Sequence, residues 1–368
     1  MTPIYYIGLM SGTSLDGIDA VLVNFGEPKP VLLATLFYPY DEELRANLLA
    51  LHHAGFDELN RAALLSNQLS ILYAQTSLNL LKKSKIDPKA VTAIGCHGQT
   101  IRHCPEKEKH YTIQLVNAAL LAELTQITVI ADFRSRDIAA EGQGAPLVPA
   151  FHKAFFGDPH KHRIIVNIGG IANITRLDPT DEVIGFDCGP GNILMDAWSL
   201  RHTGKNYDDK GQWAKTGKIV QSLFDLLMDQ SFFSFPPPKS TGRELFNLHW
   251  LEYKISQCTP QSPENVQATL LQLTVISIAN AITDYCSATS EIYICGGGAH
   301  NTHLIKQLSN ALPHCTVALT NKLGVDADWV EAFAFAWLAQ LTILRKPGNL
   351  SAVTGAKGER ILGAIYPA

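Results

Sequence analysis

Apolar residues along the first part of the chain change their spacing several times. Residues 4–7 and 18–25 are apolar runs typical of strands, and a polar, glycine-rich turn separates them. Residues 44–81 carry apolar positions at helical spacing, and residues 91–98 resemble a buried strand that ends in a polar loop. Because helix and strand alternate in this way, the pattern predicts an α/β fold.

The alternation continues to the end of the chain. Further strands are predicted at residues 127–131, 163–168, 174–177, 182–186 and 291–295, a charged loop at 132–137, and further helices at 117–124, 193–200, 266–285 and 329–341. Residues 163–177 repeat the strand, glycine turn and strand of residues 4–25. Two similar hairpins predict two similar domains, which we place at residues 1–145 and 146–368, and a return of the C-terminal segment onto the first domain stays open.

Composition narrows the class of protein. The 368 residues are 46% hydrophobic and 17% charged, which is enough apolar material for real cores. The net charge is −4 and no basic run could follow a phosphate backbone, so nucleic acid is not an expected partner. The N-terminus has no cationic region before an apolar one, and no apolar stretch reaches the ~20 residues of a membrane helix. We therefore expect a cytoplasmic protein without a membrane partner.

Four turns are rich in glycine. Residues 12–17 offer backbone N–H groups and hydroxyls that can surround phosphate oxygens, because glycine permits a close approach. Similar turns stand at Gly169-Gly170 and at residues 187–192, and the three can face one polyphosphate. The fourth turn, residues 295–301, follows a strand and could let an adenine or ribose lie on its backbone. Taken singly, each turn could also be an ordinary tight connection.

Together these turns resemble the phosphate hairpins and adenosine motif of the ASKHA superfamily, which includes sugar kinases, actin and the heat-shock chaperone ATPases. Residues 8–19, 95–103, 132–137 and 185–192, with 242–244 and 362–367, narrow the resemblance to the anhydro-N-acetylmuramic acid kinase family over essentially the whole chain.

The resemblance implies a two-domain, ribonuclease H-like ASKHA fold with an active-site cleft between the domains. It also implies a bacterial homodimer that uses ATP and Mg²⁺ in cell-wall recycling. Its expected reaction opens the anhydro bridge of 1,6-anhydro-N-acetylmuramic acid with water and phosphorylates the 6-oxygen, giving N-acetylmuramic acid 6-phosphate and ADP.

The nucleotide site expected from the turns and the resemblance contains glycines, hydroxyls and carboxylates. Its residues are Gly12, Thr13, Ser14, Leu15, Asp16, Gly17, Ile18, Asp19, Gly169, Gly170, Asn173, Gly189, Gly191, Asn192, Gly296, Gly297 and Gly298. Magnesium prefers phosphate and water oxygens, so Asp16 or Asp19 is expected only in its outer shell, and its direct ligands stay open.

Asp187 is our candidate catalytic base. It follows an apolar strand beside a glycine turn that could face the γ-phosphate, and an aspartate with the usual pKa of ~3.9 is ionised at neutral pH. One carboxylate suffices, because the phosphoryl group captures the leaving oxygen that a glycosidase must protonate. The alternative is that Asp187 caps the N-terminus of the following helix.

Candidate sugar-binding residues are His97, Gly98, Thr100, Arg134 and Glu331. The planar fork of Arg134 suits a lactyl carboxylate, although such an arginine could instead be solvated or pair with Asp132 or Asp137. Glu331 is included by resemblance, and could simply be a first-turn charge favoured by the helix dipole. We interpret His97 and His103 as hydrogen-bonding groups rather than metal ligands, because their spacing is not that of a helical zinc motif.

Two questions stay open at the level of sequence. The loop of Lys239, Ser240, Thr241 and Arg243 follows three prolines and could contact phosphate or simply cover the surface. The chain could also be a kinase for another amino sugar, or an actin-like or chaperone-like ATPase that switches partner binding, since a fold does not fix a substrate.

Overall fold

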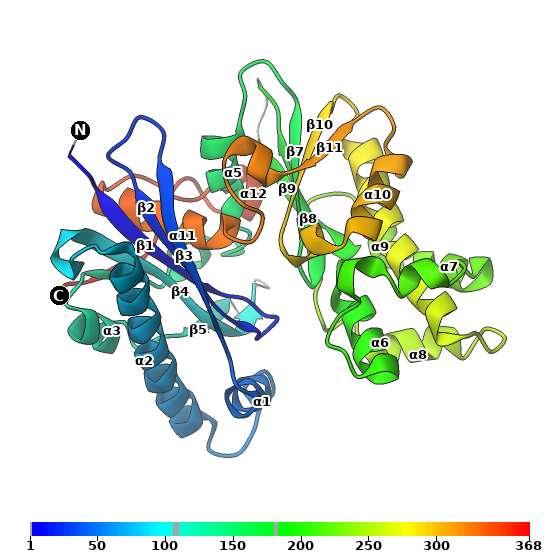
Figure 1. Ribbon diagram of the computed structural model, residues 1–368, viewed down its shortest axis with the longest axis horizontal. Coiled ribbons are helices and arrows are strands. Elements are labelled where there is room, and N and C mark those ends of the chain that lie inside the picture. The colour runs from blue at the N-terminus through cyan, green and yellow to red at the C-terminus, as the bar shows by residue number, and fades with distance from the viewer. Residues whose placement is uncertain (1, 106–109, 180–182) are drawn as a thin grey trace. The chain divides into compact units, whose positions relative to one another are not determined.

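The computed structural model describes residues 2–105, 110–179 and 183–368. They form two compact units, one made of Met1–Phe151 with Trp329–Ala368 and the other of His152–Asp328, called unit 1 and unit 2 here (Figure 1). Each unit contains one β-sheet. The limits 1–145 and 146–368 stay predictions for the domains.

The sheet of unit 1 has the order β12-β6-β4-β1-β2-β3, and β5 pairs with β4. Its strands are β1 (Tyr5–Ser11), β2 (Gly17–Asn24), β3 (Val31–Pro39), β4 (Val91–Cys104), β5 (Tyr111–Leu115), β6 (Val129–Ala131) and β12 (Ala364–Tyr366). β1, β2 and β3 are antiparallel, whereas β1, β4 and β6 are parallel. The first predicted hairpin is therefore confirmed, and β12 brings the end of the chain back to this sheet.

The helices of the first part of the chain differ from the prediction in two places. They are α1 (Glu42–Ala50), α2 (Glu58–Ser84), α3 (Ala118–Thr125), α4 (Ser135–Ala139) and α5 (Val148–Phe156), followed near the C-terminus by α11 (Val330–Ile343) and α12 (Ser351–Thr354). The helical spacing predicted over residues 44–81 belongs to two helices, α1 and α2, and the non-helical residues 51–57 separate them; Asp57, in a left-handed conformation, is the N-cap of α2. The loop predicted at 132–137 is also wrong from Ser135, where α4 begins.

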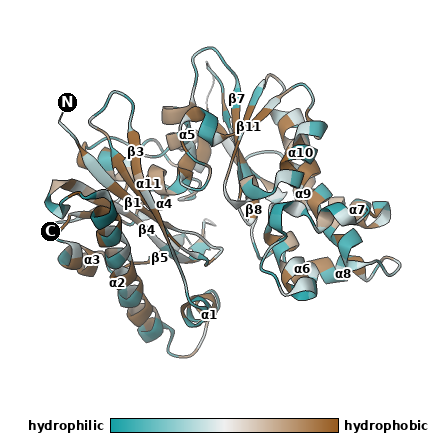
Figure 2. Cartoon of the chain, viewed as in Figure 1, coloured by the Kyte–Doolittle hydropathy of each residue, from teal (hydrophilic) through white to brown (hydrophobic). Residues whose placement is uncertain are grey.

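Helix α11 lies directly on the unit 1 sheet because two glycines let it approach. A Cβ atom on Gly8 of β1 would collide with the carbonyl oxygen of Ala332, and one on Gly95 of β4 with that of Phe335. The neighbours of Gly8 along β1, Ile7 and Leu9, point to the opposite face and join the core beneath α2. Figure 2 shows both teal and brown residues on α2, as expected for an amphipathic helix.

The sheet of unit 2 has the order β11-β10-β7-β8-β9. Its strands are β7 (Arg163–Ile168), β8 (Ile171–Leu177), β9 (Ile184–Pro190), β10 (Glu291–Cys295) and β11 (Thr316–Leu319). Three antiparallel strands are again followed by two parallel ones, the same sequence of connections as in unit 1. This confirms the α/β class and the two similar halves that the two hairpins predicted. Glu182, where the third strand of this unit was predicted to begin, lies outside the described residues.

The helices of unit 2 cluster after β9. They are α6 (Ile193–Thr203), α7 (Gln221–Met228), α8 (Leu248–Ile255), α9 (Pro263–Tyr285) and α10 (Thr302–Ala311). Short 3₁₀ turns in the two units are Pro88–Ala90, Asp209–Gly211, Ala214–Thr216, Ser231–Ser234, Gly297–His300 and Thr320–Leu323.

Helix α9 corrects the expectation that no apolar stretch reaches the length of a membrane span. It has 23 residues, and its most apolar window has a mean hydropathy of 1.4, enough by length and composition to cross a membrane. Of that window, however, 78% is buried inside the protein, and the buried residues include Leu270, Leu271 and Ile278. This burial is typical of a core helix.

Candidate active site

Three of the four glycine-rich turns meet in unit 2. The Gly191 N–H donates to the carbonyl of Gly170, and the Asn192 N–H donates to that of Gly169, both at 2.8 Å. The fourth turn lies against the same place, because a Cβ on Gly298 would collide with Ile168 at the end of β7. The structure therefore brings the fourth turn to the other two, although it follows them by more than a hundred residues in the sequence.

Two glycines of these turns, Gly170 and Gly297, are exposed, and Gly169 is half-buried. The nearest atom to a Cβ built on Gly169 is 3.6 Å away, on Gly170 3.8 Å and on Gly297 3.9 Å. Gly296 has a φ of +78°, which favours glycine, and its Cβ would collide with the Asn167 side chain. Space of this kind over a glycine backbone fits phosphate or ribose, which need a close approach to backbone N–H groups.

Asp187 lies within β9 rather than after it. The strand continues to Pro190, and the residue before helix α6 is Asn192. The alternative that Asp187 caps α6 is therefore wrong. Its carboxylate oxygen Oδ2 accepts hydrogen bonds from the Thr241 N–H at 2.9 Å and from the Ser240 hydroxyl at 3.1 Å.

Burial raises the pKa of Asp187 to about 6, while the Thr241 N–H and the Ser240 hydroxyl favour the ionised form and Glu244 opposes it. A base in this range is ionised at neutral pH and still basic enough to accept a proton from water.

Sequence reasoning predicted Asn173 but missed Asn167, which lies in the same polar row beside Asp187. Asn173 of β8 stands opposite Asp187 of β9 on one side and Asn167 of β7 on the other, so the three side chains share one face of the sheet. The signal was a polar Asn167 in an otherwise apolar strand. Asp196 of α6 was also missed, and burial beside Asp208 raises its pKa to about 7.

The first predicted hairpin turn lies in unit 1 and is tightly braced. The Leu15 N–H donates to the Gly12 carbonyl at 3.2 Å, and the Ser14 hydroxyl donates to Asp16 at 2.7 Å. Gln99 of β4 donates to the Gly12 carbonyl at 3.0 Å. Thr13, Ser14 and Asp16 are exposed and Asp19 is half-buried, whereas Leu15, Gly17 and Ile18 are buried. These three could contact a nucleotide only through their backbone.

Arg134 and His97 form the centre of the predicted sugar site in unit 1. Nε and Nη2 of Arg134 both donate to His97 Nε2, at 3.1 and 2.8 Å, and Nη1 donates to the Gly144 carbonyl at 2.7 Å. Burial and the nearby guanidinium hold the pKa of His97 well below its usual range. The ring is therefore neutral, with its proton on Nδ1.

Glu331 and Gly98 lie near this pair, whereas Thr100 contacts Gln114 of β5. Glu331 of α11 and Asp137 oppose the effect of burial, which lowers the pKa of Arg134 to about 10. Gly98 follows His97 on β4 with a φ of +76°, and the Thr100 hydroxyl accepts a hydrogen bond from Gln114 at 3.2 Å. Asp137 itself accepts from the Gly144 N–H and the side chains of Asn349 and Thr354.

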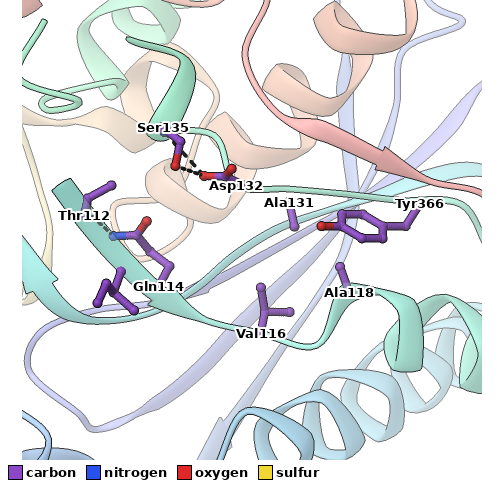
Figure 3. A pocket seen from close by; sticks show the side chains of 9 residues that line it. Thr112, Gln114, Val116, Ala118, Ala131, Asp132, Ser135 and Tyr366 are labelled. Atoms are coloured by element: carbon purple, nitrogen blue, oxygen red, sulfur yellow. Dashed lines mark hydrogen bonds between the residues drawn. The ribbon is translucent and has the colours of Figure 1, made fainter. Parts of the chain in front are cut away.

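A cavity of ≈ 230 Å³ opens elsewhere in unit 1, between β5 and β6. It is lined by Thr112, Ile113, Gln114, Val116, Ala118, Ala131, Asp132, Ser135 and Tyr366. Figure 3 shows Asp132 and Ser135 together at one end and the Tyr366 ring at the other. Its lining includes none of the predicted site residues, although Asp132 and Ser135 flank Arg134 in the sequence.

Comparisons with known proteins agree over the whole chain. The family model described as "Anhydro-N-acetylmuramic acid kinase" matches residues 4–368. A protein of that name from Nitrosospira multiformis is 60% identical over 368 residues, 100% of both chains. Another from Nitrosomonas europaea is 60% identical over 364 residues, 99% of this chain and 100% of the relative.

Among solved structures, component A of (R)-2-hydroxyglutaryl-CoA dehydratase from Acidaminococcus fermentans is 10% identical, with a TM-score of 0.48 over 90% of this chain and 96% of that one. The family match and the two relatives span nearly every residue from the first hairpin to β12. The chain therefore belongs to the anhydro-N-acetylmuramic acid kinase family.

Proposed function

We propose that this chain hydrolyses the 1,6-anhydro bridge of 1,6-anhydro-N-acetylmuramic acid and phosphorylates the 6-oxygen, using ATP and water and giving N-acetylmuramic acid 6-phosphate and ADP. The observation that carries the proposal is the place of Asp187: a half-buried carboxylate on β9, in the same unit as three joined glycine turns. Family membership supports this choice of sugar.

In the proposed reaction Asp187 takes a proton from a water molecule that attacks the anomeric carbon. A bond forms from the water oxygen to that carbon as the bond from the carbon to the 6-oxygen breaks. The 6-oxygen bonds to the γ-phosphorus as the bond to the β-phosphate oxygen breaks. The phosphoryl group thus replaces the proton that an ordinary glycosidase supplies to its leaving group.

The nucleotide would lie on the glycine turns. In unit 2, Gly169, Gly170, Gly189, Gly191 and Asn192 would surround phosphate oxygens, and Gly296, Gly297 and Gly298 would lie beside the adenosine. The hairpin at residues 12–17 is proposed separately as the phosphate-binding turn of unit 1. Asn173 would hydrogen-bond to phosphate or to the attacking water, because it stands opposite Asp187 on the sheet. The exposed backbone at Gly170 and Gly297 supports this placement.

Magnesium would enter with the phosphates. Its chemistry is to neutralise negative charge on the phosphate oxygens, and it prefers oxygen ligands. The carboxylates of Asp16 and Asp19 have the required donor atoms, and exposed Asp16 is held by the Ser14 hydroxyl. We assign both to the water shell of the ion.

The sugar would lie on Arg134 and its neighbours. A guanidinium has five N–H donors, and three of those of Arg134 are used by His97 and Gly144, which leaves one on Nη1 and one on Nη2. Those two can hold a lactyl carboxylate bidentately. His97, Gly98, Thr100 and Glu331 would contact the hydroxyl and acetamido groups.

We also propose that the enzyme is cytoplasmic and acts in peptidoglycan recycling, because its substrates would be ATP and a salvaged wall sugar. We further propose that it is a homodimer. Phe56 and Leu59, at the start of α2, are 94% and 89% exposed, which supports an apolar contact with another chain. Light scattering on the purified protein would give the mass.

ADP release tests the reaction. We would supply Mg-ATP with 1,6-anhydro-N-acetylmuramic acid, N-acetylmuramic acid, N-acetylglucosamine or no sugar. Release should depend on the anhydro sugar and should be lost in Asp187→Asn, while Asp229→Asn, an exposed aspartate of the same unit, should keep it. Turnover of an ordinary amino sugar would instead indicate a sibling kinase, and slow release without sugar would indicate a switch ATPase.

A further inference from the structure

The loop at residues 236–243 is fastened to Asp187 by three hydrogen bonds. The Asp187 N–H donates to the Lys239 carbonyl at 3.0 Å, and Asp187 Oδ2 accepts from the Ser240 hydroxyl at 3.1 Å and from the Thr241 N–H at 2.9 Å. Three consecutive loop residues therefore contact both the backbone and the carboxylate of one residue. The position of this carboxylate depends on the loop.

The loop is itself anchored to the body of unit 2. Three prolines precede Lys239 and restrict the backbone. The Lys239 ammonium donates to the carbonyls of Phe232 and Phe233, each at 3.2 Å, and lies 4.8 Å from the centre of the Phe232 ring. Phe232 is only 4% exposed. Because its base is held in this way, the loop presents Ser240 and the Thr241 N–H at a fixed place.

The two oxygens of Asp187 differ as a result. Oδ2 has two donors, whereas within the described part of the chain no hydrogen bond reaches Oδ1. A proton placed on Oδ2 would compete with the Thr241 N–H, which can only donate, and would require the Ser240 hydroxyl to turn and accept. A proton on Oδ1 meets no such conflict, so Oδ1 is the oxygen available for proton transfer.

We propose that Ser240 is a positioning residue of the active site: its hydroxyl, together with the Thr241 N–H, holds Oδ2 of Asp187 and leaves Oδ1 as the oxygen that takes the proton from water. This inference rests on the proposed role of Asp187 as the base. It gives the loop at residues 236–243 a task beyond covering the surface. The same donors favour the ionised carboxylate and so keep the base active closer to acidic pH.

The test is the pH profile of kcat/KM for the anhydro sugar at saturating Mg-ATP. For the unmodified enzyme the acidic limb should lie near about pH 6. In Ser240→Ala the limb should move up by about one pH unit, giving roughly tenfold lower kcat/KM on the acidic side and little change on the alkaline plateau. Ser240→Thr keeps a hydroxyl and should restore the limb.

Ser234→Ala is the matched control, since that exposed hydroxyl donates to the Ser231 carbonyl in the same part of the unit. An equal loss of kcat/KM at every pH in Ser240→Ala, or a profile identical to that of the unmodified enzyme, would overturn the proposal for Ser240. Asp187→Asn separates the two levels. If it keeps its turnover, the base itself is misassigned; if it is inactive while the Ser240→Ala profile is unchanged, only the role of Ser240 is lost.

Discussion

Arg134 shows how one residue can be both structural and ready for a ligand. Its guanidinium donates to Nε2 of His97, which places the ring proton on Nδ1, and to the carbonyl of Gly144. Two of its five N–H groups are not used in these hydrogen bonds. Burial lowers its pKa only to about 10, so it keeps its charge at neutral pH. A preformed, charged fork of this kind costs little to organise when a carboxylate binds.

Replacing Arg134 by Lys should therefore reduce sugar discrimination. Lysine keeps the charge but loses the bidentate fork, and charge-assisted hydrogen bonds contribute about 1.5–3 kcal/mol each, so KM for the anhydro-muramic sugar should rise at least ~10-fold. KM for 1,6-anhydro-N-acetylglucosamine, which lacks the lactyl carboxylate, should change much less. Steady-state kinetics on both sugars measures this difference.

Arg136→Lys is the control for that experiment, because Arg136 is exposed and two residues away. Equal increases of KM for the two sugars in Arg134→Lys would show that Arg134 does not recognise the lactyl group.

At the scale of elements, the packing of α11 depends on the absence of side chains at Gly8 and Gly95. Both are on central strands, β1 and β4, where a Cβ would strike the helix backbone rather than a flexible side chain. Backbone cannot move aside as a rotamer can, so the helix or the sheet would have to shift. The two glycines thus fix how close Glu331, carried by α11, stands to Arg134.

Gly95→Ala should lower the stability of the protein by about 1–3 kcal/mol, the usual cost of overpacking, and the melting temperature by roughly 5 °C. Gly55→Ala is the control, because its Cβ would meet only the flexible Arg61 side chain at 3.3 Å. Thermal unfolding followed by circular dichroism compares the two variants. Equal melting temperatures would contradict the close contact of α11 with the sheet.

The sequence predicted the elements with clear apolar periods and missed those without them. The strands beside both glycine hairpins and helices α3, α6, α9 and α11 form where apolar residues indicated them. Strand β3 was missed because its residues are partly exposed and lack strict alternation. Strand β12, with three residues, exists only because β6 offers an edge, which no local pattern reveals.

The candidate site could be predicted as a set of residues but not as a geometry. Motif resemblance indicated Asp187 and Arg134 as site residues, and their functional roles remain proposals. The partners that hold them, Ser240 and Gly144, lie 53 and 10 residues away in sequence. Contacts at that separation depend on tertiary packing, so spacing and composition could not assign them.

At the scale of the whole molecule, the two units differ in how the chain builds them. Unit 2 is one continuous stretch, His152–Asp328, whereas unit 1 joins two distant stretches. Unit 2 also has its own sheet and a buried core that includes Ile164, Val166 and Leu273. A continuous segment with its own core can fold alone.

We therefore expect a fragment of residues 152–328 to unfold in one cooperative thermal transition. If its glycine turns bind nucleotide, ADP at 100 times its dissociation constant should add about 2.7 kcal/mol to its stability. The anhydro sugar should give no such increase, since its proposed contacts are in unit 1. A fragment that melts without a transition would contradict the independence of unit 2.

Because unit 1 is built from two separate stretches of the chain, the two units can complete their folding at different times during synthesis. A ribosome releases the N-terminal part of a chain first, so Gly8 and Gly95 emerge long before α11, the helix that covers them. Strand β6 likewise lacks its partner until β12 has been synthesised. Unit 2 can complete its core during synthesis, while unit 1 stays unfinished until α11 and β12 have emerged. A premature stop before α11 would thus leave Gly8 and Gly95 uncovered, and one between α11 and β12 would leave the edge of β6 unpaired, so both products should be cut more readily by proteases.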